Sequence, residues 1–395
     1  MRWPIGLLLL SAACRHGTPG PDGDVWTPPR SFQGRQEGRV QQISPGGGTH
    51  ATEEAVSEAL LWLARHQEHD GHWNVKGFIS RCNDTPCSGT GTGNCDVGVT
   101  SLALLAFLGA GHTSRSEDRF GVVVQNALAW ILLNQDREGA IGDRSPKHLY
   151  NHAIGTQALC EAYGMTGDAE LRLAAQKATD FLVAAQNPGK GWRYSPRCGD
   201  NDSSVTGWAV MALKAAEWSG LKVPKAAFDG ALAWMNEVTD RGNFFRTGYT
   251  RKNDGKVFCP GKNEAFENHP TPAAISVASR LLIQEQLKDP ALMAVRLLLR
   301  DLPEWKKNKI DYYYWHWGSL ALFQFDIPQG PAWHSWNESL QSVLVQNQKG
   351  TEAGCLKGSW DVDCDRWGFE GGRVYTTAIN ALTLETYYRY PRMVK

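Results

Sequence analysis

The stretch Leu173–Gly220, LAAQKATDFLVAAQNPGKGWRYSPRCGDNDSSVTGWAVMALKAAEWSG, decides the fold. Its first part ends at Gln186 and carries apolar residues three and four positions apart, a spacing that predicts an amphipathic helix. The glycines and the tryptophan of 189–192 predict a turn, because glycine adopts backbone angles that other residues avoid. A second apolar segment, Ser203–Gly220, predicts another helix. The stretch therefore predicts one helix–turn–helix unit.

Similar pairs of helices recur along most of the chain, and the opening stretch is the third of six. In the other five, first helices are predicted over 52–67, 122–135, 226–238, 292–302 and 336–348, and second helices over 96–109, 152–163, 271–286, 313–325 and 376–388. The second helices are apolar on most faces, which predicts burial on most faces. We therefore expect an all-α fold, an (α/α)6 toroid whose six helix hairpins form an inner ring of second helices inside an outer ring of first helices.

Three units share a glutamine near the end of the first helix and a glycine–tryptophan turn after it: Gln67 with Gly71-x-Trp73, Gln186 with Gly191-Trp192, and Gln348 with Gly358-x-Trp360. This repeat resembles that of the terpenoid cyclase and protein prenyltransferase superfamily of α/α toroids. The segments 191–194, 199–202 and 372–375 also resemble bacterial prenyltransferase and squalene oxidase repeat-containing proteins. The resemblance covers Ala55–Tyr390 and implies a fold without an assigned reaction.

Composition bounds the class of protein. Of 395 residues, 42% are hydrophobic and 21% are charged, which is ordinary for a globular protein with a substantial core. The 41 basic residues balance the 41 acidic ones, and no basic block stands out. Binding to a phosphate backbone needs a basic face, so we expect no nucleic-acid partner.

Residues 1–13 are predicted to be a signal peptide. The apolar run Ile5–Leu10 is too short to span a bilayer, and small residues lead from it to Cys14. The pattern resembles a bacterial lipoprotein signal, in which Cys14 becomes the lipidated N-terminus. We expect export to the periplasm or outer membrane as a lipoprotein, with plain secretion as the alternative. Residues 14–50, rich in Gly, Pro, Gln and Arg, are predicted to be a disordered linker before a toroid domain over 51–393.

Eight cysteines remain after Cys14, an even number that suits disulfide pairing in an oxidising compartment. Cys355 and Cys364 flank one loop, so we expect a disulfide between them. Cys160 lies in an apolar helix and is expected to be a buried free thiol. Zinc is the competing interpretation of the cysteines, and the sequence disfavours it because the chain has no CxxC pair.

Candidate functional residues gather near the starts of the second helices. These helices are expected to run parallel, so their N-termini, with unpaired N–H groups and partial positive charge, meet at one mouth of the toroid. The candidate catalytic acids and bases are Asp200, Asp202, His152 and His316. The candidate ligand-binding residues are Asp96, Trp192, Arg193, Tyr194, Tyr312, Trp315, Arg373 and Tyr375. The alternatives are helix capping for the acids and core packing for the aromatic residues.

The metal and acid motifs of known families are incomplete here. Asp361, Asp363 and Asp365 alternate as at the start of a calcium loop, but the glycine and glutamate that complete an EF-hand loop are absent. The resemblance to prenyltransferases implies zinc, yet the residues of the right type, Asp363, Cys364 and His316, lack the local motif. The run 361–364 likewise departs from the DxDD acid of squalene and hopanoid cyclases by its final cysteine. Zinc and calcium remain the two candidate cofactors.

Three hypotheses of function follow. The first is a cell-envelope toroid that binds an apolar or anionic ligand in a central cavity, with a lipid, isoprenoid, glycan or peptide as its partner. The second is an enzyme acting on an isoprenoid or glycan through the acids and histidines of the mouth. The third is a protein–protein scaffold with a filled core. The sequence leaves catalysis open, and we expect a monomer attached to the membrane through Cys14.

Overall fold

The computed structural model describes residues 26–35, 39–83, 85–254, 257–259, 263–266, 269–283, 288–307, 309–326, 330–391 and 393. The predicted signal peptide and Cys14 lie outside the described residues. Within this part of the chain, no helix is long and apolar enough to cross a membrane.

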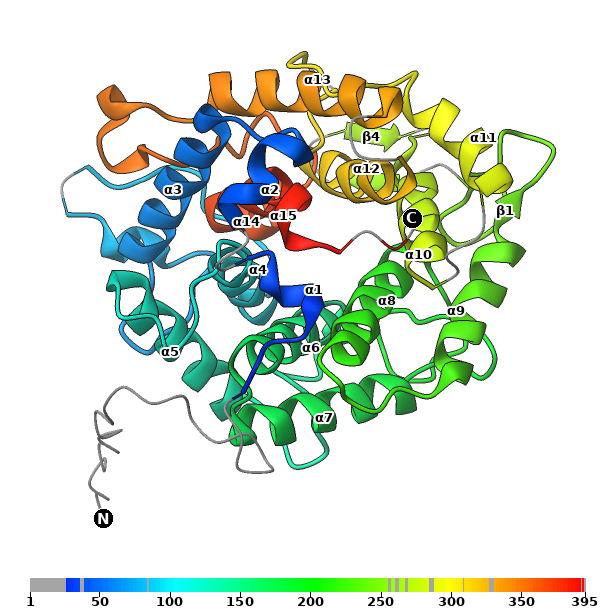
Figure 1. Ribbon diagram of the computed structural model, residues 1–395, viewed down its shortest axis with the longest axis horizontal. Helices are drawn as coiled ribbons and strands as arrows, with labels where there is room; N and C mark the ends of the chain where they lie inside the picture. The colour runs from blue at the N-terminus through cyan, green and yellow to red at the C-terminus, as the bar shows by residue number, and fades with distance from the viewer. Residues whose placement is uncertain are drawn as a thin grey trace.

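Two concentric rings of helices make up the molecule (Figure 1). The outer ring contains α3 (His50–Arg65), α5 (Arg119–Leu133), α7 (Ala169–Ala184), α9 (Lys225–Glu237), α11 (Lys288–Leu298) and α13 (Pro331–Asn347). The inner ring contains α4 (Asp96–Gly109), α6 (His148–Thr166), α8 (Ser203–Trp218), α10 (Thr271–Ile283), α12 (Tyr312–Phe325) and α14 (Gly368–Leu384). Each inner helix packs against the next, and α14 packs against α4. The prediction of an all-α toroid is confirmed.

The remaining elements are short. They are α1 (Arg30–Gln33), α2 (Arg39–Gly46), α15 (Thr386–Arg389), the 3-10 helices η1 (Phe78–Arg81) and η2 (Thr351–Leu356), and the strands β1 (Thr239–Asp240), β2 (Arg246–Thr247), β3 (Val257–Cys259) and β4 (Asn263–Phe266). The strands pair as two small antiparallel ladders, β1 with β2 and β3 with β4. Both ladders lie in the connection between α9 and α10.

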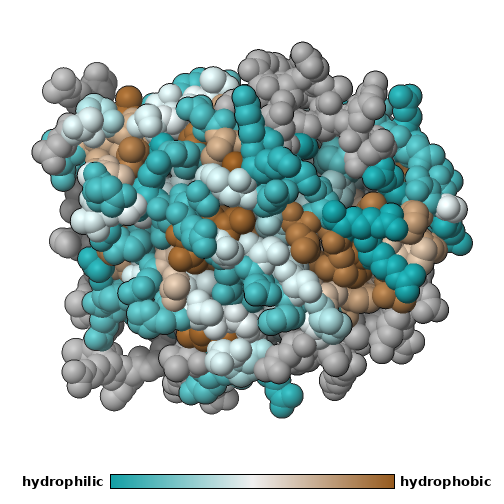
Figure 2. All heavy atoms as spheres, turned by 90° about the horizontal axis from the view of Figure 1, so that it is seen from above, coloured by the Kyte–Doolittle hydropathy of each residue, from teal (hydrophilic) through white to brown (hydrophobic). Residues whose placement is uncertain are grey.

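The two rings differ in burial as their sequences predict. In α8 every residue from Ser203 to Ala216 is buried, and in α4 every residue from Gly98 to Gly109 is buried. The outer helices bury one stripe only; α7, for example, buries six residues spaced along one face. The face over α13 and α11 is accordingly mostly hydrophilic with smaller apolar patches (Figure 2). Burial of the apolar inner helices is the main favourable term for this fold.

The repeat glutamine joins four of the six units to the unit that follows. The side-chain amide of Gln186 donates to the carbonyl of Lys190 in its own turn at 2.6 Å and to Ala227 at the start of α9 at 2.9 Å. Gln67 donates in the same way to Gly71 and to Val123 of α5, both at 2.9 Å. Gln135 repeats the pattern with Gly139 and with Ala174 of α7. One amide thus satisfies two carbonyls that belong to neighbouring units.

The repeat glycine and tryptophan fix the turn itself. Gly71, Gly139 and Gly358 have φ between +91° and +101°, and a Cβ on any of them would lie 2.2 Å from a backbone oxygen of the next outer helix. Only glycine fits this approach. The indole N–H of Trp73 donates to Leu63 at 2.8 Å, and that of Trp192 donates to Leu182 at 2.8 Å. The buried indole therefore anchors the turn to its own outer helix.

The last unit uses the same device to close the ring. Gln348 donates to Gly358 at 2.9 Å and to Ala55 of α3 at 2.7 Å. This bond joins α13 to α3 across 293 residues of sequence. The chain therefore forms a ring whose seam lies between its last and first hairpins.

The segment ahead of the toroid is partly ordered, which corrects the prediction of a disordered linker over 14–50. The rings of Trp26 and Tyr163 are in tilted contact with centroids 5.5 Å apart, and Phe32 is fully buried. The helices α1, α2 and α15 lie together over the centre of the ring (Figure 1). The Gly- and Pro-rich composition predicted disorder. The order depends on only a few large side chains, which a composition-based prediction does not register.

A buried ion cluster fastens these elements to the inner ring. Glu161 of α6 accepts from Arg389 at 2.9 Å and from Arg35, and all three side chains are at most 1% exposed. The two guanidinium groups hold the pKa of Glu161 below its ordinary value against the opposing effect of burial. The ends of the described chain are thereby tied to the mouth at the C-terminal ends of the inner helices.

Two inner helices begin earlier than predicted. The α6 helix starts at His148 instead of residue 152, after Lys147 in a left-handed conformation that no sequence signal marks. The α14 helix starts at Gly368 instead of residue 376, and Gly372 interrupts it with φ of 64°. The interruption removes the regular spacing on which the prediction relied.

We predict that Gln348→Ala lowers the free energy of unfolding by about 1–3 kcal/mol, because the carbonyl of Gly358 loses its side-chain donor and the bond from α13 to Ala55 of α3 is lost. Urea denaturation measures the change. The control is Gln346→Ala on the same helix, where the side chain is exposed and the change should stay within about 0.5 kcal/mol. Equal effects of the two substitutions would contradict a role for Gln348 in closing the ring.

Candidate ligand site at the mouth of the toroid

Side chains from opposite inner helices span the axis of the ring. The hydroxyl of Tyr150 on α6 donates to that of Tyr313 on α12 at 2.8 Å, and Ser204 on α8 lies 2.5 Å from the same oxygen. The indole N–H of Trp208 donates to Tyr313 at 3.0 Å. Since α6 and α12 lie on opposite sides of the ring, this network bridges its centre near the N-terminal ends of the helices.

His316 lies below this network, in the core. Its ring stacks on Trp208 with centroids 5.9 Å apart, and its Nδ1 lies 3.2 Å from the hydroxyl of Thr383. Burial lowers the pKa of His316 to about 3. The residue is 2% exposed, so the structure places His316 in the core and not on the surface of the mouth.

His152 is a structural histidine as well. The backbone N–H of Ile141 donates to its Nδ1 at 3.1 Å, and its Nε2 donates to the carbonyl of Ala178 at 3.1 Å. Thr100 and Thr206 accept the equivalent N–H in units one and three, so His152 fills the threonine position of unit two. Burial lowers the pKa of His152 to about 3. The structure thus gives His152 a role in holding the turn of unit two.

Most of the predicted ligand-binding residues make hydrogen bonds or packing contacts within the fold. Asp96 accepts from the backbone N–H of Val75 at 2.8 Å and fixes the loop before α4. Arg373 is 2% exposed and donates to Ser88, Ser359, Trp360 and Asp361. Trp192, Tyr312, Trp315 and Tyr375 are buried in the core. Core packing was the correct alternative for these aromatic residues.

Arg193, Tyr194, Asp200 and Asp202 lie together beside the start of α8. Asp202 is fully buried and caps α8 by accepting from the N–H of Val205 at 2.7 Å, while Arg193 lies 3.9 Å away. Burial raises the pKa of Asp202 to about 7. Asp200, in contrast, is exposed. Of the four predicted acids and bases, Asp202 alone is a buried carboxyl group with a raised pKa at the mouth.

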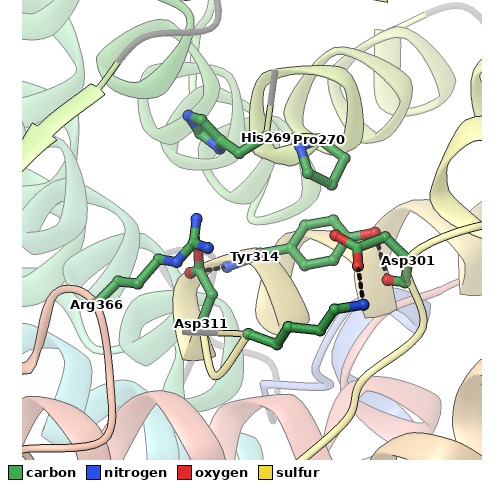
Figure 3. A pocket seen from close by; sticks show the side chains of 7 residues that line it. His269, Pro270, Asp301, Asp311, Tyr314 and Arg366 are labelled. Atoms are coloured by element: carbon green, nitrogen blue, oxygen red, sulfur yellow. Dashed lines mark hydrogen bonds and ion pairs between the residues drawn. The ribbon is translucent and has the colours of Figure 1, made fainter. Parts of the chain in front are cut away.

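A pocket of about 250 Å³ lies off the axis, between the starts of α10 and α12. It is lined by His269, Pro270, Asp301, Lys309, Asp311, Tyr314 and Arg366. Figure 3 shows His269 and Pro270 on one side, with Asp311, Tyr314 and Arg366 across from them. Of these seven, His269 and Tyr314 lie among the histidines and aromatic residues that the sequence places at the starts of the second helices, and the other five carry no such signal. Asp311 could have been suspected, because it directly precedes the apolar run of α12.

Charges in the pocket occur in opposite pairs. Lys309 lies 3.5 Å from Asp301, and Arg366 lies 4.0 Å from Asp311. The hydroxyl of Tyr314 donates to the carbonyl of Asp301 at 3.0 Å, which holds its ring as a wall of the pocket. Burial, with a contribution from Arg366, lowers the pKa of His269 to about 3, so the imidazole is neutral. The lining therefore offers donors, acceptors and one aromatic face with little net charge.

Two buried carboxyl groups stand at the start of α12. Asp311 caps the helix by accepting from Tyr314 at 2.8 Å, and burial raises its pKa. Asp365 accepts from the backbone N–H of Tyr312 at 2.8 Å and of Trp367 at 3.0 Å. Burial and the charge of Asp311 raise the pKa of Asp365 to about 7. Proximity to the pocket gives Asp311 access to a ligand, while Asp365 lies behind it.

The alternating acids do not form a calcium site in this structure. Asp361 pairs with Arg373 at 2.9 Å and with Lys349 at 2.7 Å. Asp363 is exposed, whereas Asp365 is buried among backbone donors. The three side chains have different surroundings and do not converge on one point in this structure.

The predicted disulfide between Cys355 and Cys364 is not formed either. Both are free thiols, and Cys364 lies 3.3 Å from the hydroxyl of Tyr312. The sulfur of Cys355 instead lies 3.4 Å from Nε2 of His66. Cys160 is a buried free thiol, as expected.

Comparison with known proteins shows the fold and no more. No family model matches the chain, and no curated protein sequence is detectably similar to it. Among solved structures, an inactive variant of the α-1,6-mannanase GH76A of Salegentibacter sp. HEL1_6 in complex with α-1,6-mannotetrose has a TM-score of 0.58 at 10% identity, with 85% of this chain and 98% of that chain covered.

Two further solved structures have the same fold. An α-amylase from Clostridium perfringens has a TM-score of 0.52 at 10% identity and covers 85% and 98% of the two chains. The type II terpene cyclase MstE from Scytonema has a TM-score of 0.50 at 13% identity and covers 86% and 97%. The protein is thus an α/α toroid of the architecture that glycoside hydrolases and terpene cyclases share.

We predict that Asp202→Asn changes the pH dependence of stability. The raised pKa means that the folded protein holds a proton that the unfolded chain releases near its ordinary pKa of about 4, so wild-type stability falls as pH rises from about 4 to 7. Asparagine keeps the helix cap and removes this proton. Urea denaturation at pH 5 and pH 8 should show the variant gaining relative to wild type, by up to about 1.4 kcal/mol per pH unit.

The matched control for this experiment is Asp200→Asn, which changes the exposed neighbour. Its stability should run parallel to that of the wild type across the pH range. A curve for Asp202→Asn that also runs parallel would show that Asp202 is ionised in the folded protein at pH 5.

Proposed function

We propose that this protein is a glycan-binding toroid that holds a saccharide unit in the pocket between α10 and α12. The observation that carries the proposal is the lining of that pocket, where paired donors and acceptors surround an aromatic ring. Neutral polyhydroxylated ligands suit such a lining, because each hydroxyl both donates and accepts a hydrogen bond. A polyprenyl chain would shield the charged groups of Asp311 and Arg366 from water without adding a hydrogen bond to either, at a cost in desolvation.

Two further observations support this choice over a ligand on the axis. The hydroxyl network of Tyr150, Ser204 and Tyr313 occupies the centre of the ring at the level of the mouth. The solved toroids with this fold include a mannanase with a bound mannotetrose and an amylase. The proposal includes a monomeric protein located in the cell envelope. The location rests on the signal peptide predicted before Cys14.

A hydrolase is the second candidate function, and the buried carboxyl groups favour it. Glycoside hydrolysis needs a carboxylic acid that is still protonated near neutral pH to protonate the leaving oxygen. Asp311 faces the pocket with a raised pKa, and Asp365 stands behind it with a pKa of about 7. Asp311 would be the general acid, and its charge raises the pKa of Asp365.

We predict that Asp311→Asn weakens binding of α-1,6-mannotriose or of maltotriose at least about tenfold, because a charged acceptor facing the ligand is lost while the helix cap is kept. Isothermal titration calorimetry measures the affinity, and release of reducing ends from the same sugars measures hydrolysis. Asp200→Asn is the control and should bind as the wild type does.

The outcomes separate the two candidates. Binding without release of reducing ends supports the glycan-binding toroid, and release that disappears in Asp311→Asn supports the hydrolase. If the wild-type protein binds neither sugar, or if Asp311→Asn binds as tightly as wild type, the pocket is not a site for these saccharides.

A further inference from the structure

Three cysteines and one histidine converge near the seam of the ring, far apart in sequence. His66 follows the last turn of α3, Cys82 and Cys87 flank a short loop after η1, and Cys355 lies in η2. Nε2 of His66 lies 3.5 Å from the sulfur of Cys82, 3.4 Å from that of Cys87 and 3.4 Å from that of Cys355. The four ligand atoms all lie within 4.8 Å of one another.

These distances are the edges of a tetrahedron of the size that zinc requires. A zinc ion with Zn–S bonds of about 2.3 Å and a Zn–N bond of about 2.0 Å places the nitrogen about 3.5 Å from each sulfur. The three distances from Nε2 agree with this value. Three thiolates and one imidazole are also a donor set that structural zinc sites use.

The surroundings of the cluster orient these donors. Nδ1 of His66 donates to the carbonyl of Trp62 at 2.8 Å, which fixes the tautomer and turns the lone pair of Nε2 toward the sulfurs. Trp62 stacks on the imidazole with centroids 4.1 Å apart. The backbone N–H of Cys87 donates to the sulfur of Cys82 at 3.2 Å, an interaction that stabilises a thiolate. The cluster therefore has an ordered outer shell of the kind metal sites need.

A disulfide accounts for less of this geometry. It would join two of the three sulfurs and leave the third as a lone thiol beside the imidazole. The equal distances of all three sulfurs from Nε2 have no role in that arrangement. A metal ion uses all four groups at once.

We propose that His66, Cys82, Cys87 and Cys355 bind one Zn²⁺ ion that clasps the first hairpin of the toroid to the last. Four protein ligands complete a tetrahedral site, so the ion has a structural role and leaves no position for a substrate. The ion would lie at the seam of the ring, near two other contacts between the last and first hairpins. Gln348 donates to Ala55 of α3, and Gly358 packs closely against the backbone of Glu58. This inference is independent of the proposed glycan site.

The test uses the full chain purified without added chelator, with zinc measured by mass spectrometry of the digested protein. We expect one zinc per chain, and X-ray absorption at the zinc edge should fit three sulfurs at about 2.3 Å and one nitrogen at about 2.0 Å. Cys355→Ser should lose the stoichiometric zinc. Cys364→Ser, nine residues further on and outside the cluster, is the matched control and should retain it.

A second measurement does not depend on how well a variant folds. Wild-type protein stripped of metal and titrated with Co²⁺ should develop the charge-transfer absorption of thiolate-bound, tetrahedral cobalt, and a chelator should lower the Tm of the zinc-loaded protein. The proposal is overturned if reconstituted wild-type protein holds no stoichiometric zinc or cobalt. It is equally overturned if non-reducing peptide mapping of the native protein finds two of the three cysteines joined as a disulfide.

Discussion

The structure depends on a glutamine side chain that satisfies two backbone carbonyls at once. The carbonyl of the turn packs under the next outer helix, and leaving such a buried group unpaired would cost about 1–3 kcal/mol. The second carbonyl lies inside the next outer helix and also accepts a helical N–H, so the glutamine bond adds a link between the two units. Gln67, Gln135, Gln186 and Gln348 each donate to their own turn and to a carbonyl within the first two turns of the following outer helix. The sequences that end the fourth and fifth outer helices, 232–242 and 296–305, contain no glutamine. The joints around the ring are therefore not equivalent.

Closure of the ring determines where function can lie. Six apolar helices packed side by side around one axis leave a narrow centre, and Tyr150, Trp208, Tyr313 and His316 fill it with hydrogen-bonded and stacked rings. The other mouth is covered by α1, α2 and α15, which the ion cluster of Glu161 holds in place. Polar chemistry is thus confined to the rim at the N-terminal ends of the inner helices. The pocket at Asp311 lies there, in the region where unit five departs most from the repeat.

The fold could be predicted because the sequence features that indicate it are periodic. Helical spacing, the Gln–Gly–Trp repeat and the apolar second helices all recur, so each copy supports the others. Site residues lack this support. His152 looked like a catalytic base, yet it replaces a threonine that accepts one N–H in units one and three. That equivalence becomes visible only when the turns are superimposed in space. His316 likewise faces the ring axis because of a helix rotation that spacing alone leaves undetermined.

Contacts between segments that are distant in sequence were the second feature that could not be predicted. Cys355 and Cys364 share a loop, but Cys355 points across the seam toward His66, 289 residues away. The pocket joins residues from the starts of α10, α12 and α14, none of which carries a recognisable motif. Spacing rules such as CxxC describe sites built from one hairpin. They cannot reveal a site assembled by ring closure.

Hydrogen exchange, followed by mass spectrometry on the native protein, tests the closed ring most directly. If the seam is closed as described, backbone amides in α3 and α14 should exchange as slowly as those in α6 and α8, because all four helices open only when the whole ring unfolds. Exchange in α3 and α14 that is much faster than in α6 and α8 would show an open solenoid with frayed ends, and would contradict the account.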